Sequence, residues 1–288
     1  MAPFTAYAYL DIDHPMVAWE VYRGVIVSQA AHEVNPGPVS LMFAGLMHAR
    51  NVARFNNELT IERVRAHSFP EQVSRLEAIY LFEKRDEAMA AEIWGAHFTP
   101  ENLASLGVRP QSPVCKVDAN WITYAPTDAY GYLLDNDLAW IERYWSGIAF
   151  NNTPVWELLC HGRAHVLSKN VRQRAYDKLM VNTPQVRETL EISRLAAFVD
   201  SDLGHVTPWL TKAEENRYVL DYYMNFEDAK NTEVLRQMVD PAVPRNWKDL
   251  PAGWDGKFTV PDLREYGIEF ELRQGYKGKD SRIGIHHN

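Results

Sequence analysis

Alternation of hydrophobic and polar positions along the first half of the chain predicts several short β-strands. Such runs, rich in β-branched and aromatic residues, are typical of half-buried strands. They occur at residues 4–12, 74–83, 113–123 and 155–168. The last segment is interpreted as two strands joined by a turn at His161-Gly162. Residues 16–30 fit either a helix or a short strand, and both interpretations stay open.

Helices are predicted where apolar residues recur about every three to four positions. This spacing occurs over residues 39–66, through 59–67, and over 84–95, 135–147, 170–182, 185–200 and 232–239. Phe69-Pro70 ends the second of these helices, and an Asp is expected to cap the helix at 135–147. Thr99 before Pro100, followed by an apolar run and a glycine, predicts one more short helix over residues 98–107.

The order of these elements suggests how the chain is organised. Strands and helices alternate over residues 1–168, whereas residues 169–288 carry mainly helical patterns and one strand pattern at 267–276. We therefore expect a core over residues 1–168 and a helical extension over residues 169–288 that a C-terminal strand closes. A single intertwined domain is the alternative. The Pro- and Gly-rich segments 32–40 and 241–263 are predicted to be irregular.

Composition and charge narrow the classes of function. Apolar residues make up 46% of the chain and charged residues 24%, which are ordinary globular values. The formal net charge of −8 repels nucleic acid and anionic membranes at long range, which excludes non-specific coating of DNA. A local basic patch that binds a phosphate, a dinucleotide or a specific RNA stays compatible with this net charge. The absence of HExxH, GxSxG, P-loop and GxGxxG motifs argues against a zinc protease, an α/β-hydrolase, a P-loop NTPase and a simple Rossmann dehydrogenase.

The remaining composition favours a cytoplasmic location. Cys115 and Cys160 match no metal-binding spacing, so we expect two reduced thiols in the core. No apolar run approaches the ~20 residues that span a bilayer, and residues 1–10 lack the pattern of a signal peptide. His286-His287 is predicted to lie in a polar tail rather than to bind metal.

Two acidic segments are candidates for chemistry. Glu58 and Glu62 are four apart and lie on one face of a predicted helix, which is also typical of a solvated surface. Glu157 lies between Trp156 and Leu158 at the start of a predicted strand. A carboxylate beside indole rings has a raised pKa unless a cation compensates, which suits a catalytic residue. The alternative is a strand-edge carboxylate paired with Arg163.

A second acidic pair competes with Glu157. Glu269 and Glu271 lie two apart on one face of the predicted C-terminal strand. Such a pair is compatible with a catalytic site and equally with a solvent-facing edge strand. Ser74-Arg75 opens another predicted strand, where it either faces a pocket or marks a turn.

The run from Asn56 to Phe82, followed by YWSG, WELL and G-x-A-x-VL between residues 144 and 167, resembles a group of bacterial and phage ADP-ribosyltransferase-like proteins. The resemblance covers about residues 4–168. It implies an α+β fold with a split, mostly antiparallel β-sheet and flanking helices, in which the sheet clamps NAD as a substrate. The expected activity is transfer of ADP-ribose to a protein or nucleic-acid acceptor, as in some toxin and phage systems.

The resemblance also implies roles for individual residues. Glu157 would be the catalytic carboxylate, and residues 147–156 the loop that recognises the target. Cofactor contacts would come from Tyr7 or Tyr9 on the first strand, Ser74, Arg75 near the phosphates, and Tyr80, Tyr144 and Trp145 against the nicotinamide. Val155 stands where arginine-directed enzymes carry a second acidic residue, so transfer to arginine is not supported.

Two other classes of function stay open at this point. One is a non-catalytic binding or structural protein on the same scaffold, and the other is a hydrolase acting on a nucleotide or sugar. Convergence of Tyr9, Ser74 and Glu157 in one cleft favours the transferase, whereas a glycoside-type hydrolase needs a second carboxylate near Glu157.

Overall fold

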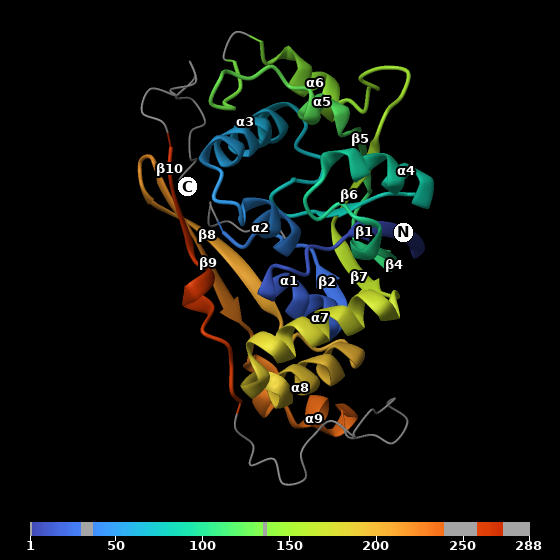
Figure 1. Cartoon of the computed structure of the whole chain (residues 1–288), viewed down its shortest axis with the longest axis vertical. Helices are drawn as coiled ribbons and strands as arrows, with labels where there is room; N and C mark the ends of the chain where they lie inside the picture. Colours follow the sequence, from blue (N-terminus) through green and yellow to red (C-terminus); the bar gives the residue numbers. More distant parts are fainter. Residues whose placement is uncertain (1, 30–36, 135–136, 239–257, 273–288) are drawn as a thin grey trace.

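The computed structural model describes residues 2–29, 37–134, 137–238 and 258–272. Three antiparallel sheets and helices on several sides form a mixed α+β structure in this part of the chain (Figure 1). The first sheet has the order β1-β4-β7-β2, with β1 (Phe4–Tyr9), β4 (Leu103–Pro110), β7 (Gly162–Val166) and β2 (Val25–Val27). The second has β6 (Trp156–Cys160) between β3 (Ile79–Leu81) and β5 (Cys115–Asp118). The third has β9 (Arg217–Met224) between β10 (Ile268–Glu271) and β8 (Val206–Glu214).

The first and second sheets meet at two places. Tyr7 and Phe82 exchange backbone hydrogen bonds of 2.9 and 2.7 Å, which joins β1 to the end of β3. The chain also passes from β6 directly into β7 through the turn at His161-Gly162. A Cβ at Gly162 would lie 2.3 Å from the carbonyl oxygen of Arg109, so only glycine fits this passage.

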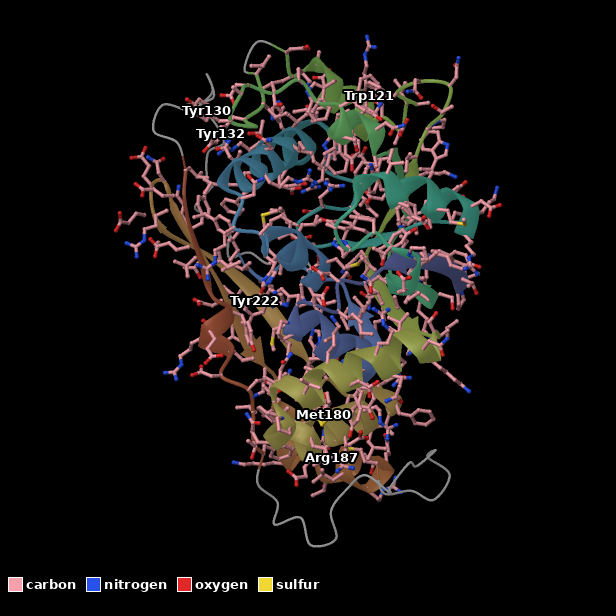
Figure 2. All side chains as sticks on the ribbon, viewed as in Figure 1. Trp121, Tyr130, Tyr132, Met180, Arg187 and Tyr222 are labelled. Atoms are coloured by element: carbon pink, nitrogen blue, oxygen red, sulfur yellow. The ribbon has the colours of Figure 1, made fainter. Side chains whose placement is uncertain are left out.

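The helices lie around these sheets, as Figure 1 shows. The α-helices are α1 (Pro15–Arg23), α2 (Leu41–Met47), α3 (Val52–Ser68), α4 (Arg85–Ala90), α5 (Asn120–Thr123), α6 (Ala139–Trp145), α7 (Lys169–Asn182), α8 (Arg187–Phe198) and α9 (Thr232–Met238). Short 3-10 helices are η1 (Ala91–Trp94), η2 (Pro100–Asn102), η3 (Pro184–Val186), η4 (Glu227–Lys230) and η6 (Leu263–Tyr266). Helices α3, α5 and α6 occupy one end of the molecule, and α7, α8 and α9 the other. In Figure 2, Trp121 marks the first end, and Met180 and Arg187 mark the second.

One large apolar cluster runs through the middle of the molecule. It contains buried residues of the first sheet, of α1 and α2, of α7 and of the third sheet, among them Trp19, Phe43 and Leu220. Phe55 of α3 stacks on Phe270 of β10 with ring centroids 4.4 Å apart. Residues on both sides of position 168 therefore share one core. A second cluster, under α6, includes Ile61, Tyr80, Tyr144, Trp145 and Leu159.

Several sequence predictions are confirmed. Strands β6 and β7 lie on the two sides of the turn at His161-Gly162. Helices cover most of residues 170–182 and 185–200, and β10 lies in the predicted C-terminal strand. Residues 16–30 contain both of the open alternatives, since α1 is followed by β2. Helix α3 ends where Phe69 stops it. Segment 241–257 and His286-His287 lie outside the described residues.

Other predictions are wrong because a local sequence pattern was extended to residues that have a different structure. Residues 98–107 form only the turn η2 and then β4, whose alternating burial pairs it with β1 and β7. The region 39–66 is two helices, because Asn51 caps a new helix by accepting a hydrogen bond from the N–H of Arg54. Ser74 lies in a turn rather than a strand, since its carbonyl accepts hydrogen bonds from Glu77 and Ala78. Helix α6 has no side-chain cap at its N-terminus.

The predicted helical extension is also incomplete. Residues 206–224 form the hairpin β8–β9, which packs β10 against the rest of the core. Residues alternate between buried and more exposed along both strands, as in Tyr218, Leu220 and Tyr222, which point inward. Figure 2 shows Tyr222 on this third sheet. Among the described residues, none of the helices has the length and apolar character needed to cross a membrane.

Candidate functional site

A cavity of about 460 Å³ opens where β1, β3 and β6 meet α2, α3 and α5. Its volume lies in the range of sites for small organic ligands. Most of the lining is apolar or aromatic, and a few polar side chains converge on it. The polar and aromatic lining residues are Tyr9, Asp11, Arg54, Arg75, Tyr80, Phe82, Trp94, His97, Phe98, Thr123 and Glu157.

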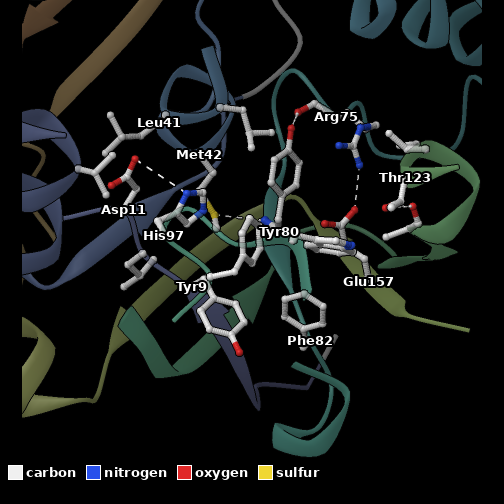
Figure 3. Close-up of a pocket in the computed structure, with 18 of the residues that line it drawn as sticks. Tyr9, Asp11, Leu41, Met42, Arg75, Tyr80, Phe82, His97, Thr123 and Glu157 are labelled. Atoms are coloured by element: carbon white, nitrogen blue, oxygen red, sulfur yellow. Dashed lines mark hydrogen bonds and ion pairs between the residues drawn. The ribbon is translucent and has the colours of Figure 1, made fainter. Parts of the chain in front are cut away.

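Aromatic rings form one wall of the cavity. Tyr9 lies 5.2 Å from Phe98 and 6.1 Å from Phe82 between ring centroids, and Trp94 packs edge-on against Phe98 at 4.9 Å. The hydroxyl of Tyr9 donates to the carbonyl of Ala88 at 3.1 Å, and burial raises its pKa to about 12. Figure 3 shows this hydroxyl pointing away from the other labelled side chains. Tyr9 therefore offers the cavity its ring and not its hydroxyl.

The opposite wall carries a buried cluster of charges around Arg75. Its Nη1 donates to Oε2 of Glu157 and to the hydroxyl of Tyr144, both at 2.8 Å. Its Nε donates to Oε2 of Glu58 at 2.9 Å, and Nη2 lies 3.3 Å from Oε1 of the same residue. All of these side chains are buried. The guanidinium is thus shared by two carboxylates and a phenol.

The pKa values of the two carboxylates of the cluster are shifted in opposite directions. Burial raises the pKa of Glu157, and Arg75 offsets this only in part. Burial acts in the same way on Glu58, but Arg75 and Arg54 together hold the pKa of Glu58 below its usual range. The difference follows from the number of cations, because Arg54 lies 2.7 Å from Oε1 of Glu58. Of the two carboxylates, Glu157 is therefore the one whose pKa is raised, as is common for groups at functional sites.

Local structure holds Arg75 at both ends. The hydroxyl of Tyr80 donates to the backbone carbonyl of Arg75 at 2.5 Å, and the guanidinium lies 4.9 Å from the centroid of the same ring. Glu157 faces this pair from β6, the central strand of the second sheet. Figure 3 shows Arg75, Tyr80 and Glu157 converging on the cavity.

Four of the predicted site residues line the cavity together, and three do not. Tyr9, Arg75, Tyr80 and Glu157 are lining residues. Tyr144 and Trp145 are 0% exposed and do not line the cavity, so they do not stack on a ligand there. The hydroxyl of Ser74 accepts a hydrogen bond from the N–H of Leu76 within its turn.

The structure also shows where the other acidic candidates lie. Glu58 is buried, so the alternative of a solvated helix face is wrong for this residue. Arg163 pairs with Asp202 at 2.8 Å, not with Glu157. Glu269 and Glu271 lie exposed on the edge strand β10, where Glu269 pairs with Arg217 at 2.7 Å. That pair fits the solvent-facing edge and lies outside the cavity.

Sequence reasoning missed several lining residues, which arrive from loops and helices without a motif. His97 follows two residues with positive φ, and its Nδ1 lies 3.9 Å from Oδ2 of Asp11. Burial lowers the pKa of His97, and Asp11 opposes that shift. Arg54 and Thr123 come from α3 and the end of α5. The only available signal was Asp11, the next-to-last residue of the aromatic segment 4–12.

The loop before Glu157 is tied to β5 and α5. The carboxylate of Asp118 accepts hydrogen bonds from the backbone N–H groups of Asn120, Phe150 and Val155 at 3.0, 2.8 and 3.0 Å. Trp121 donates to the carbonyl of Ile148 at 2.7 Å. The predicted target loop, 147–156, therefore has a defined shape. Ala119, Ile122 and Thr123, from the segment to which this loop is tied, line the cavity, whereas residues 147–156 do not.

Cysteines and metal ligands add little to the site. Both Cys115 and Cys160 are buried and free, as predicted. Within the described ranges, no group of three or more His, Cys, Asp or Glu side chains is arranged to hold a metal ion.

One family model matches the middle of the chain. Residues 39–173 are similar to a family described as "Protein of unknown function (DUF2441)". No curated protein matches the chain. The matched span contains Arg54, Arg75, Tyr80 and Glu157, whereas Tyr9 and the rest of β1 lie before it.

Proposed function

We propose that this protein transfers ADP-ribose from NAD to an acceptor, with Glu157 as the catalytic carboxylate. The observation that carries the proposal is the position of Glu157, whose buried carboxylate lies 2.8 Å from Arg75 in the wall of a cavity that aromatic rings also line. A planar nicotinamide ring stacks well on aromatic side chains. A single carboxylate that a cation holds in place is suited to stabilising positive charge on a sugar.

The proposed reaction needs one carboxylate to stabilise positive charge on the ribose and residues that orient this carboxylate. The bond between C1′ of the ribose and the nicotinamide nitrogen breaks, and the nicotinamide leaves with the electron pair. Glu157 accepts a hydrogen bond from a ribose hydroxyl and stabilises the oxocarbenium character that develops at C1′. The acceptor then forms a bond to C1′ and loses a proton. Tyr80 and Arg75 keep the carboxylate in one orientation throughout.

The arrangement of sheets supports an ADP-ribosyltransferase-like fold as part of this proposal. Antiparallel sheets of four and three strands meet at the Tyr7–Phe82 pair, and the cavity lies beside that junction. Glu157 lies at the second position of β6, directly after the loop that Asp118 holds. Of Tyr9, Ser74 and Glu157, the first and last converge, and Arg75 lines the cavity in place of its neighbour Ser74.

A glycoside-type hydrolase is less well supported because it needs two carboxylates flanking one bond. Glu58 is close to Glu157 through Arg75, but its side chain is 0% exposed and it does not line the cavity. Asp11 does line the cavity. In Figure 3, however, Asp11 and Glu157 lie on opposite sides of Tyr80.

The test is NAD turnover by the purified protein with labelled NAD and a host-cell lysate as acceptor. The Glu157→Gln variant removes the charge but keeps the shape, and Glu269→Gln on the exposed edge of β10 is the matched control. We expect transfer by the wild type and by Glu269→Gln, and a loss of about 10²–10³-fold in Glu157→Gln. NAD binding without turnover in all three proteins would favour the non-catalytic binding protein. No binding of NAD contradicts the proposal.

A further inference from the structure

Two arginines line the cavity, and they differ in how many hydrogen-bond donors remain for a ligand. The resemblance assigned the phosphates of the substrate to Arg75. Its guanidinium, however, already makes four hydrogen bonds, to Glu58, Tyr144 and Glu157. Its side chain is 5% exposed. Arg75 therefore positions Glu157 and has little capacity left for a phosphate.

Arg54 is in the opposite situation. It lies in the first turn of α3, and its side chain is 34% exposed while it lines the cavity. Its Nη2 lies 2.7 Å from Oε1 of Glu58, and among the described residues neither its Nε nor its Nη1 makes a hydrogen bond. Glu58 thus fixes one edge of the guanidinium and leaves other N–H groups free to bind a ligand.

We propose that Arg54 is the phosphate-binding residue of the cavity and takes the diphosphate group of a nucleotide. A planar guanidinium matches two phosphate oxygens at once, which a single hydrogen bond to Glu58 does not prevent. The aromatic wall of Tyr9, Phe82 and Trp94 supplies apolar surface for the planar part of the same ligand. The identification of that nucleotide with NAD rests on the proposed function, whereas the phosphate site does not.

The connection to Glu157 gives this site a defined place in the cavity. Glu58 binds Arg54 through Oε1 and Arg75 chiefly through Oε2, and Arg75 in turn binds Glu157. One buried carboxylate therefore holds both the phosphate-binding arginine and the arginine that orients the reacting carboxylate. A nucleotide held at Arg54 meets Glu157 in a geometry that the cluster has already set.

Equilibrium binding tests the site without reference to turnover. The ligands are ADP, inorganic pyrophosphate and adenosine at low salt, measured by calorimetry on the full chain. The variants are Arg54→Gln, Arg54→Lys and, as the control, Arg63→Gln, which changes an exposed arginine of the same helix outside the cavity. We expect ADP and pyrophosphate to bind the wild type and Arg63→Gln equally. Arg54→Gln is expected to lose at least tenfold in affinity, and Arg54→Lys about three- to tenfold.

Several results overturn the proposal. They are unchanged ADP affinity in Arg54→Gln, adenosine binding as tight as ADP binding in the wild type, or no binding of ADP and pyrophosphate to the wild type. If Arg54→Gln does not fold, Arg54→Lys decides, because it keeps the charge beside Glu58 but loses the planar fork. If ADP binding depends on Arg54 but the protein does not turn over NAD, the phosphate-site proposal is supported and the proposed transferase activity is contradicted. If the protein turns over NAD but ADP binding does not depend on Arg54, the transferase activity is supported and the phosphate-site proposal is contradicted.

Discussion

Nη1 of Arg75 lies 2.8 Å from Oε2 of Glu157, although the two residues are 82 positions apart in the chain. The contact joins the turn before β3 to the second residue of β6, and both side chains are buried. A buried ion pair stabilises little on its own, because desolvation of both charges opposes the attraction between them. Its main consequence here is that it fixes the direction of a carboxylate in the wall of a cavity.

Replacement of Arg75 by Met should lower the free energy of unfolding by about 3–5 kcal/mol, because it leaves Glu157 buried without its cation. Glu58 would keep Arg54 as a partner. Urea denaturation near pH 7 measures the effect. The double variant Arg75→Met, Glu157→Gln serves as the control and should recover part of the loss. Equal stability of Arg75→Met and the wild type would show that the pair has no energetic role.

The sequence allowed part of this site to be predicted. Glu157, Tyr80 and Tyr9 lie in or next to aromatic strand patterns whose period is visible, and the change from β6 to β7 follows from the turn at His161-Gly162. Burial of Glu58 was not visible, because two arginines that neutralise it come from a different turn of its own helix and from a separate loop. A charged helical position has the same local pattern whether tertiary contacts bury it or not.

Errors in the predicted elements have the same origin. Thr99-Pro100 is a good start for a helix, but the alternation from Leu103 to Pro110 pairs on both sides with β1 and β7, and those pairings prevail. The hairpin β8–β9 was missed, although Tyr218, Leu220 and Tyr222 of β9 are buried and alternate with the more exposed Val219 and Asp221. Tyr144 and Trp145 were assigned to the nicotinamide by the resemblance, and packing in the cluster under α6 buries both.

The Glu77→Gln substitution should stabilise the protein at alkaline pH. Burial, together with nearby Glu62, raises the pKa of Glu77 to about 7. The folded state therefore holds this proton more tightly than the unfolded chain, so stability falls as pH rises from about 4.5 to 7, and the cost persists above that range. After allowance for solvent screening, we expect Glu77→Gln to gain about 1–2 kcal/mol near pH 8 and much less near pH 5.

Urea denaturation at the two pH values checks this prediction. Glu215→Gln, in the exposed turn between β8 and β9, is the matched control and should change stability little at either pH. A gain of equal size at both pH values would contradict the assignment to ionisation of Glu77.

Replacement of Asp118 by Asn should loosen the loop before Glu157. One carboxylate accepts three backbone hydrogen bonds, from Asn120, Phe150 and Val155, and a neutral amide cannot accept all of them equally. We expect the free energy of unfolding to fall by about 1.5–3 kcal/mol. Hydrogen exchange should become faster at the amides of Phe150 and Val155, while exchange in α7 stays as in the wild type. Unchanged exchange at both amides would show that Asp118 does not hold the loop.

The Gly162→Ala substitution should disturb the passage from the second sheet to the first. The backbone of Gly162 has φ +156, and an added Cβ would lie 2.3 Å from the carbonyl oxygen of Arg109 and 2.9 Å from Cα of Pro110. Both atoms belong to the backbone of β4, so the pairing of β4 with β7 has to open to make room. We expect a loss of about 2–3 kcal/mol in the free energy of unfolding.

Gly95→Ala, where nothing lies within 4 Å of the added atom, separates this clash from the conformational cost of a glycine with positive φ. Because β6 ends at the same turn, displacement of Gly162 should also move Glu157, and NAD turnover should fall by more than the unfolded fraction explains. Wild-type stability of Gly162→Ala would mean that β4 and β7 are farther apart than their register indicates.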